Sequence, residues 1–407
     1  MAPPRAPRML SEAAMLRAVV QAVAPVAASE LLPLGPALRG RVCARDLASP
    51  LDLPGGATAT MDGYAVRRRD LPGPLPVIGA AVAGAPWTGA VPPGTCVKIA
   101  TGAWVPAGLD AVLPWETVTA DAERITAAAA PRAANIRPAG ADVRRGTPAA
   151  KRGQRLGARD LALLHGLGVD RVEVWRRPTV GVMSTGDELR DGGARLDPGC
   201  CHDANRGMLL ALLAQHGFEA RDCGLIHDER AALEERMREA AAACDLLLTS
   251  GGASVGERDL VKAVLAERGR LTSWRVAIKP GKPFVLGELD ATPVLGLPGN
   301  PASAFVTYML LALPALLHLA GCDPLPQPPV VRARLRGGWR KSTPRTEYLR
   351  ARLSQGRSGP QVKLCAQQDS ASLAALAEAN CLVRMPLRAT KLAAGDEVDA
   401  LVLDDLL

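Results

Sequence analysis

One stretch of the sequence restricts the fold more than any other, because between residues 177 and 321 short apolar runs alternate with helical patterns. TVGVMST, FEARDCGLI and CDLLLTS are expected to form strands, followed by helices at 208–216, 229–243 and 259–268. Further strands are expected near 274–278, 284–286 and 294–297, before a long apolar helix closes the unit. Strands that alternate with helices predict a mostly parallel sheet covered on both faces.

The flanking segments have different patterns. Ser11 is a good N-cap for a helix expected over 11–32, in which Leu16, Val19 and Val23 recur at helical spacing. From about 47 to 125, short apolar runs are broken by Pro and Gly, which is typical of a small all-β unit. The chain then returns through NIRPAGADVRRG to a helix expected at 158–165, so the β unit is expected to be an insertion.

The fold class predicted from these patterns is multidomain α/β, and the chain length of 407 residues suits two to four domains at roughly 100–200 residues each. An N-terminal domain is expected from 1–46 and 136–177, with a β-rich domain inserted over 47–135. The α/β domain is expected over 178–322. After the linker DPLPQPP, strands return and predict a C-terminal β domain over 328–407.

Composition excludes several classes of protein. Apolar residues make up 48% and charged residues 22%, as in ordinary globular chains, and the 3% of aromatic residues argues against a base-stacking nucleic-acid binder. The longest strongly apolar run, 308–320, contains Pro314 and is too short to span a bilayer, and the N-terminus has no apolar signal core. Nine cysteines without a C-x-x-C pair indicate neither a disulfide framework nor a zinc ribbon, so we expect a cytoplasmic protein.

Two local features suggest ligands but have simpler explanations. Cys200, Cys201, His202 and Asp203 are adjacent and resemble metal ligands, yet neighbouring residues rarely all face one ion, so we interpret them as a strand-to-helix turn. Between residues 327 and 363, ten Lys or Arg stand against one acid, Glu347. This basic segment alternates like a half-buried strand and lacks interleaved aromatics, so we interpret it as a solvated strand face and expect no nucleic-acid or membrane binding.

The unusual sequences fall where strands of the α/β unit end, which is where open α/β sheets bind ligands. TGDE follows the first strand, His227-Asp228 the second and SGGASVG the third, with Asp259 just after it, and KPGKP and LPGNP follow later strands. Taken singly, TGDEL could be a turn with a helix cap, SGGASVG a tight turn and LPGNP a stiffened loop. Neither G-x-G-x-x-G nor G-x-x-x-x-G-K-[ST] occurs, so a dinucleotide fold and a P-loop are not supported.

The lysines carry more information than the glycines. The chain has eight Lys against 41 Arg, yet Lys279 and Lys282 stand three apart in one Pro-Gly turn. Lysine supplies a compact positive charge for a phosphate or another oxyanion. Acids and lysines that converge on one sheet edge suggest a Mg²⁺-assisted reaction on a phosphate-bearing substrate.

Taken together and in this order, the motifs resemble the molybdopterin molybdenumtransferase family, whose eukaryotic relatives include the E domain of gephyrin. The resemblance spans essentially the whole chain and includes MDGYA at 61–65, IATGA at 99–103, and NIR at 135–137 running on to Asp142. It continues through STGDEL, SGGASVG with Asp259, KPGKP and LPGNP, and ends with QDSASLAALAEANCLVRMP and AGDEV. Each motif alone is weakly specific, whereas the ordered set is highly specific.

The resemblance implies the last step of molybdenum cofactor assembly, in which molybdate and adenylylated molybdopterin react with Mg²⁺ as cofactor and AMP is released. It implies a homodimer whose cleft lies between the molybdopterin-binding α/β domain of one subunit and the N-terminal domains of the other. Other cofactor-assembly proteins and apo-molybdoenzymes are possible further partners. A paralogue for tungsten or for one molybdoenzyme, a gephyrin-like scaffold, and the related molybdopterin adenylyltransferase are the alternatives, of which the flanking domains disfavour the last.

The same resemblance implies the residues of the site. Those implied as catalytic are Asp62, Thr101, Asp142, Glu188, Asp228, Asp259, Lys279 and Lys282, with Glu188, Asp228 and Asp259 as Mg²⁺ ligands. Those implied to bind substrate are Arg137, Thr185, Gly186, Ser250, Gly251, Gly252, Ser254, Pro298, Gly299, Asn300 and Pro301. Two departures stand out: Ala141 replaces the usual Glu before Asp142, and Pro114-Trp115 replace a small apolar pair before Glu116.

Overall fold

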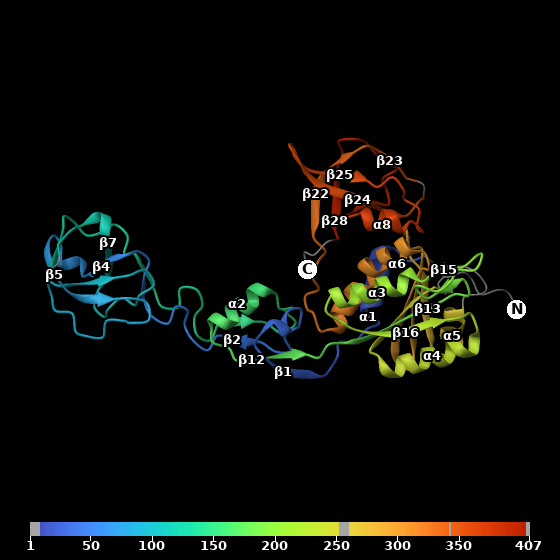
Figure 1. The fold of residues 1–407 in the computed structure, drawn as a ribbon, viewed down its shortest axis with the longest axis horizontal. Coiled ribbons are helices and arrows are strands. Elements are labelled where there is room, and N and C mark those ends of the chain that lie inside the picture. Colours follow the sequence, from blue (N-terminus) through green and yellow to red (C-terminus); the bar gives the residue numbers. More distant parts are fainter. Residues whose placement is uncertain (1–8, 122, 252–259, 342, 404–407) are drawn as a thin grey trace.

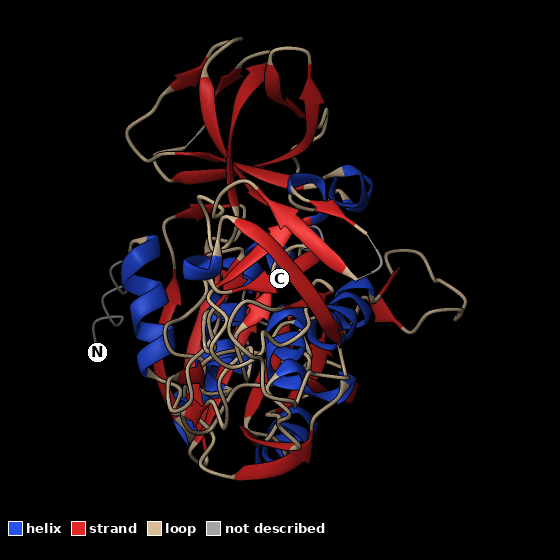
Figure 2. Ribbon diagram, turned by 90° about the vertical axis from the view of Figure 1, so that its left-hand side faces the viewer, coloured by secondary structure: helices blue, strands red, loops and turns tan. Residues whose placement is uncertain are grey.

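The computed structural model describes residues 9–121, 123–251, 260–341 and 343–403. Figure 1 shows an elongated molecule with a β-rich domain at one end, a small N-terminal domain in the middle, and the α/β and C-terminal domains together at the other end. Figure 2, turned by 90°, shows the strands of the C-terminal domain above the helices of the α/β domain. The molecule is therefore multidomain α/β, as predicted.

The α/β domain is built on a six-stranded sheet of order β16-β13-β17-β21-β20-β18. The pairs β13–β16, β13–β17 and β17–β21 are parallel, and β20 and β18 are added antiparallel, so the prediction of a mostly parallel sheet is confirmed. Its elements are β13 (Thr179–Thr185), β14 (Leu189–Arg190), β15 (Cys201–His202), α3 (Ala204–Gln215), β16 (Glu219–Ile226), α4 (Arg230–Ala243), β17 (Leu246–Ser250), α5 (Leu260–Arg268), β18 (Arg270–Arg275), β20 (Pro283–Leu289) and β21 (Thr292–Leu297).

Helices cover both faces of this sheet. On one face, Leu209 and Leu213 of α3 share a core with Val180 and Val182 of β13. On the other face, α4 and α5 pack against Leu247 of β17 and its neighbours. Successive side chains of a strand point to opposite faces, and a strand buried on both faces is mostly apolar, as at Leu246, Leu247 and Leu248 of β17.

The first helix, α1 (Glu12–Gln21), is shorter than expected and packs against the α/β domain. Ser11 caps it by accepting from the Ala14 amide, as predicted. The helix ends before Pro25, which has no N–H to continue the helical ladder, so the expectation of helix up to residue 32 is wrong. Residues 1–46, predicted as part of one unit, are thus divided between α1 on the α/β domain and strand β1 on the N-terminal domain.

The apolar helix that closes the α/β unit is a core helix. It runs through α6 (Pro301–Thr307), the π-helical turn η4 (Tyr308–Ala312) and α7 (Leu313–Leu319). The helix begins seven residues before the apolar run 308–320, so by length and composition its 19 residues could cross a membrane, contrary to the expectation from the sequence. However, 72% of an 18-residue stretch of it is buried in the protein. Pro314 cannot donate to the carbonyl four residues earlier, and the wider turn lies at that point of the helix.

The N-terminal domain contains β1 (Ser29–Pro33), η1 (Pro36–Leu38), β2 (Leu47–Ala48), β11 (Pro148–Ala150), α2 (Ala158–Gly166) and β12 (Arg171–Trp175). From it the chain enters a six-stranded sheet of order β7-β4-β6-β5-β9-β8 and returns. The elements of this β-rich domain are β3 (Thr58–Ala59), β4 (Gly63–Val66), η2 (Arg68–Asp70), β5 (Gly73–Ala81), β6 (Cys96–Ile99), β7 (Ala111–Pro114), η3 (Trp115–Thr117), β8 (Thr119–Ala120), β9 (Arg124–Ala127) and β10 (Ile136–Arg137).

The C-terminal domain is a barrel, since β26 pairs with both β28 and β24 and so closes the sheet. Its elements are β22 (Val330–Arg336), β23 (Trp339–Arg340), β24 (Thr346–Gly356), β25 (Gly359–Leu364), α8 (Leu373–Glu378), β26 (Cys381–Met385), β27 (Lys391–Leu392) and β28 (Glu397–Val402). Strand β19 (Ile278–Lys279), which follows β18 in the α/β domain, pairs in parallel with β24. This pairing attaches the barrel directly to the KPGKP turn.

Candidate functional site

A cleft of about 1080 Å³ lies at the carboxyl ends of β13, β17 and β21. The predicted residues that line it are Thr185, Gly186, Glu188, Asp228, Ser250, Gly251, Lys279, Lys282, Pro298, Gly299, Asn300 and Pro301. Gly252, Ser254 and Asp259 lie outside the described residues. Asp62, Thr101, Arg137 and Asp142 do not line the cleft. Asp62 and Thr101 adjoin β4 and β6 of the β-rich domain, which lies at the other end of the molecule (Figure 1), and Arg137 and Asp142 lie where the chain returns from it to the N-terminal domain.

Backbone forms one wall of the cleft because the glycines allow three loops to approach closely. A Cβ at Gly251, whose φ is +88°, would lie 2.1 Å from the carbonyl oxygen of Thr185. A Cβ at Gly299 would lie 3.8 Å from the Cα of Gly251. Glycine is therefore required at Gly251 for both its conformation and its space.

Two carboxylates face the cleft from neighbouring loops. The Thr185 hydroxyl donates to Asp228 Oδ1 at 2.7 Å, and the Asp228 amide donates to Asp187 Oδ1 at 2.9 Å. Glu188 folds back over Gly186, where an added Cβ would lie 2.8 Å from Glu188 Oε2. Hard carboxylate oxygens are suitable ligands for Mg²⁺, although the described residues contain no group of three His, Cys, Asp or Glu arranged for a metal ion.

The C-terminal domain contacts one of the three cleft cations, Lys279, and supplies another, Arg345. Lys279 Nζ lies 3.7 Å from Oε1 of the fully buried Glu347, which also accepts from the Trp339 indole at 2.9 Å. Half-buried Lys282 forms no ion pair within the described part of the chain, and it lines the cleft together with Arg345. Arg345 donates to the carbonyl of Ile278 at 2.9 Å, and burial lowers the pKa of its guanidinium.

Arg345 corrects part of the sequence interpretation. It belongs to the basic segment 327–363 that we interpreted as a solvated strand face, yet it lines the cleft. The interpretation holds for β22, whose arginines are exposed: Arg332, Arg334 and Arg336. The charge pattern could not separate the two cases, because the sequence does not reveal that β24 pairs with β19.

Asn205, at the start of α3, is a further residue that sequence reasoning missed. Its side-chain amide donates to Ser250 Oγ at 2.8 Å and to the carbonyl of Gly299 at 2.6 Å, so one side chain joins two of the cleft loops. The residue is 7% exposed, and its Oδ1 has no hydrogen-bond partner among the described residues. Its position as the second residue of a helix carried no sequence signal.

A loop of the C-terminal domain covers the LPGNP turn. Asn300 donates to Ser370 Oγ at 2.8 Å, and the amide of Ala302 donates to the Ser370 carbonyl at 3.0 Å. Fully buried Arg350 donates to the carbonyl of Asp369 at 2.9 Å and so supports this loop from behind. Asp369 and Ser370 therefore join the cleft lining from the family-like QDSAS motif.

A second polar cluster lies on the β-rich domain and its connection to the N-terminal domain. Asp62 Oδ1 accepts from the amide of Thr101 at 2.7 Å and from its hydroxyl at 2.9 Å, and these bonds lower the pKa of Asp62. Arg137 pairs with Asp142. Trp115, part of one of the two departures from the family pattern, is 47% exposed, and the Lys98 ammonium lies 5.3 Å from the centre of its ring. The backbone amide of Trp115 donates to the carbonyl of Asp62.

The structure agrees with the interpretation of residues 200–203 as a strand-to-helix turn rather than as a set of metal ligands. Asp203 is the N-cap of α3 and accepts from the Arg206 amide at 3.1 Å, whereas Cys201 and His202 are exposed on β15. All nine cysteines lie in the described part of the chain, and they form no disulfide there. The run is thus a strand-to-helix turn at the rim of the cleft.

Comparisons with known proteins agree along the whole chain. Residues 10–168 match the MoeA N-terminal region (domain I and II), residues 181–318 a probable molybdopterin binding domain, and residues 332–403 the MoeA C-terminal region (domain IV). The molybdopterin molybdenumtransferase of Haemophilus influenzae is 38% identical over 88% of this chain and 90% of its own length. The enzyme of the same name from Nostoc sp. is 33% identical over 90% and 87%.

Solved structures give the same result. A molybdopterin biosynthesis MoeA protein from Pyrococcus horikoshii superposes with a TM-score of 0.83 at 25% identity, over 97% of this chain and 100% of that one. Another structure described in the same way superposes with a TM-score of 0.77 at 30% identity, over 97% and 99%. With all of its domains matched in order, the chain belongs to the molybdopterin molybdenumtransferase family.

Proposed function

We propose that this protein inserts molybdenum from molybdate into adenylylated molybdopterin, with Mg²⁺-dependent hydrolysis and release of AMP. The observation that supports this proposal is the cleft itself, where four carboxylates, Glu188 and Asp228 among them, and three cations line the carboxyl edge of the sheet. The relatives named molybdopterin molybdenumtransferase supply the substrate class. We propose a cytoplasmic location, in agreement with the burial of the one long apolar helix.

The cations bind the anionic parts of both substrates. Molybdate and the phosphoanhydride are oxyanions, and Lys282 and Arg345 present charged donors to them. Glu347 fixes the ammonium of Lys279 in place. Donors that are already oriented stabilise the charge that develops on phosphate oxygens when the anhydride bond breaks.

Glu188 and Asp228 suit Mg²⁺, which usually takes one or two carboxylates and completes its shell with water and substrate phosphate. When bound, the ion would neutralise phosphate oxygens and favour the departure of AMP. Asp228, held by the Thr185 hydroxyl through one oxygen, keeps its other oxygen to orient a water. Asp259 stays a predicted third ligand outside the described residues.

We propose that the protein acts as a homodimer, because the cluster of Asp62, Thr101, Arg137 and Asp142 lies far from the cleft of its own chain (Figure 1). A second subunit would bring this cluster to the cleft. Light scattering that returns an active monomer of 42.5 kDa would contradict this arrangement.

The decisive experiment incubates the protein with adenylylated molybdopterin, molybdate and Mg²⁺ and measures AMP and active cofactor. We expect both products to require all three components. Calorimetry should show weak Mg²⁺ binding to the protein alone and tighter binding with substrate, since the phosphate supplies ligands. AMP release that is independent of Mg²⁺ would refute the metal assignment, and production of cofactor with tungstate alone would indicate a tungsten paralogue.

A further inference from the structure

A second cavity, of about 750 Å³, lies at the opposite edge of the α/β domain from the cleft. Helix α3 starts at the cleft with Ala204 and ends at Gln215 beside this cavity. The other walls come from the N-terminal domain at 39–40 and 151–157, from Arg177 just before β13, and from the linker at 322–326. The cavity thus lies where three segments distant in sequence meet.

Its lining is strongly basic. The cationic side chains are Arg39, Lys151, Arg152, Arg155 and Arg177, against the single acid Asp323. Within the described part of the chain, none of the five forms an ion pair with a carboxylate, although neighbouring Arg41 and Arg176 both do. Like charges that face one cavity without counter-charges repel one another, and an anion bound between them would remove that repulsion.

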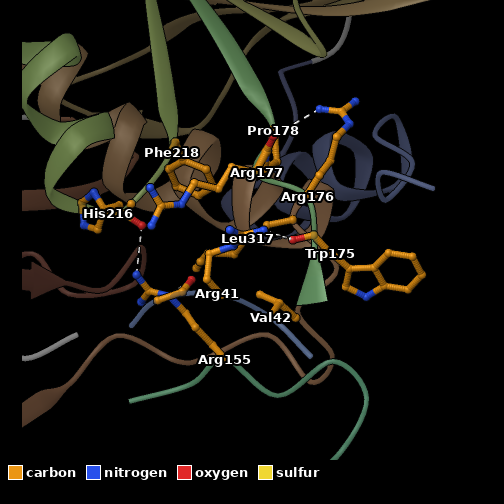
Figure 3. A pocket seen from close by; sticks show the side chains of 13 residues that line it. Arg41, Val42, Arg155, Trp175, Arg176, Arg177, Pro178, His216, Phe218 and Leu317 are labelled. Atoms are coloured by element: carbon orange, nitrogen blue, oxygen red, sulfur yellow. Dashed lines mark hydrogen bonds between the residues drawn. The ribbon is translucent and has the colours of Figure 1, made fainter. Parts of the chain in front are cut away.

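Arg155 forms the floor of the cavity and connects two domains. It comes from the N-terminal domain, and its guanidinium donates to the carbonyl of His216, just beyond α3, at 2.9 Å. Figure 3, a close view of a smaller pocket that adjoins this cavity, shows Arg155 and Arg177 both extending toward His216, whereas Arg176 points away. Burial, together with the nearby charge of Arg39, lowers the pKa of Arg155.

Glycines line the cavity next to these groups. Gly40 has a φ of +78°, and a Cβ there would lie 3.5 Å from Arg155 Nη2. The linker forms a close-packed wall, since a Cβ at Gly153 would lie only 2.6 Å from the Asp323 carbonyl oxygen. A volume of about 750 Å³ falls in the range of small-molecule sites.

We propose that this cavity binds a phosphate-bearing small molecule of nucleotide size, held by Arg39, Lys151 and Arg177. Guanidinium groups bind phosphate through paired charged hydrogen bonds, and lysine adds a point charge. The ligand would join the N-terminal domain, the α/β domain and the linker to the barrel. This site is separate from the cleft and does not depend on the reaction proposed there.

The test measures binding of pyrophosphate and of AMP to the full-length protein by calorimetry, in four forms of the chain. These are the unaltered protein, Arg39→Gln/Arg177→Gln, the cleft variant Lys282→Gln, and Arg334→Gln/Arg336→Gln. The last removes the same charge from an exposed strand face and serves as the matched control. If Arg39→Gln/Arg177→Gln fails to fold by circular dichroism, exposed Lys151→Gln replaces it.

We expect a binding step that persists in Lys282→Gln and in the control but weakens at least roughly tenfold in Arg39→Gln/Arg177→Gln, because two charged hydrogen-bonding groups are lost. Tighter binding of AMP than of pyrophosphate would identify a nucleotide, and the reverse a bare phosphate group. The proposal is overturned if neither probe binds with a Kd below about 1 mM. It is equally overturned if all binding is lost in Lys282→Gln and kept in the cavity variant.

Discussion

Replacing Asn205 with alanine tests whether its buried side-chain amide keeps the loops at Ser250 and Gly299 in place. The change removes hydrogen bonds of 2.8 Å to Ser250 Oγ and 2.6 Å to the Gly299 carbonyl, and it leaves the buried Ser250 hydroxyl without this partner. Two hydrogen bonds at roughly 1 kcal/mol each, with a further cost of about 1 kcal/mol for the unpaired hydroxyl, give a loss of about 2–3 kcal/mol. In the unaltered protein, these hydrogen bonds contribute this free energy to ordering the loops at Ser250 and Gly299.

We therefore expect Asn205→Ala to release AMP roughly 30- to 150-fold more slowly, since about 1.4 kcal/mol corresponds to a factor of ten. Amide hydrogen exchange at Gly251 and Asn300 should accelerate in parallel. Asn380→Ala is the matched control, because it also removes two amide hydrogen bonds, both to Leu353, but in the barrel. Asn205→Ala with unchanged turnover and unchanged exchange would refute the reasoning, as would an equal loss of turnover in Asn380→Ala.

Three further results are expected. Lys279→Ala should keep its circular dichroism spectrum and lose roughly 10²–10³ in turnover, as sites do when one preorganised charged donor is removed, and near-normal activity would show the site to be wrongly assigned. A triple glutamine variant of the exposed β22 arginines Arg332, Arg334 and Arg336 should release AMP normally at physiological salt. Arg345→Ala should instead slow AMP release, because Arg345 lines the cleft. Thr101→Val should raise the pKa of Asp62, followed by NMR titration, because one donor is lost. The pKa of Asp62 is lower in the folded than in the unfolded protein, so its hydrogen bonds stabilise the folded state at pH values above the unfolded-state pKa. This stabilisation is lost as the pH falls through the folded-state pKa. An unmoved titration would show that the hydroxyl does not act on Asp62.

Much of the α/β domain follows from its sequence, because its strands are short apolar runs whose ends carry glycine. TVGVMST and CDLLLTS form β13 and β17, and the loops after them line one cleft, as the position of ligand sites in open sheets implies. The end of α1 was missed because Val23 and Val26 continue an apolar pattern although they are not helical. Buried apolar spacing alone does not distinguish a helix from an extended segment packed on the same core.

The rest of the site depends on contacts between residues far apart in the chain. Arg345 and Ser370 reach the cleft only because β24 pairs with β19, a contact that no local pattern encodes. Asp62 and Thr101 entered the predicted site through the family resemblance and lie outside the cleft of their own chain. Local chemistry therefore identified the loops at the sheet edge, whereas the other contributors required the tertiary fold.

The pairing of β19 with β24 has a consequence for how modular this protein is. Ile278 and Lys279 are in register with Thr346 and Glu347, so the turn that carries two of the cleft cations is also an edge strand of the barrel. An α/β domain excised at its sequence boundaries would lose the hydrogen bonds of that strand and the counter-charge of Lys279, and it would expose an unpaired edge prone to aggregation. Recombination that exchanges the C-terminal region must therefore preserve this two-residue pairing, because a chimera without it would lose the contact that supports the turn with Lys279 and Lys282.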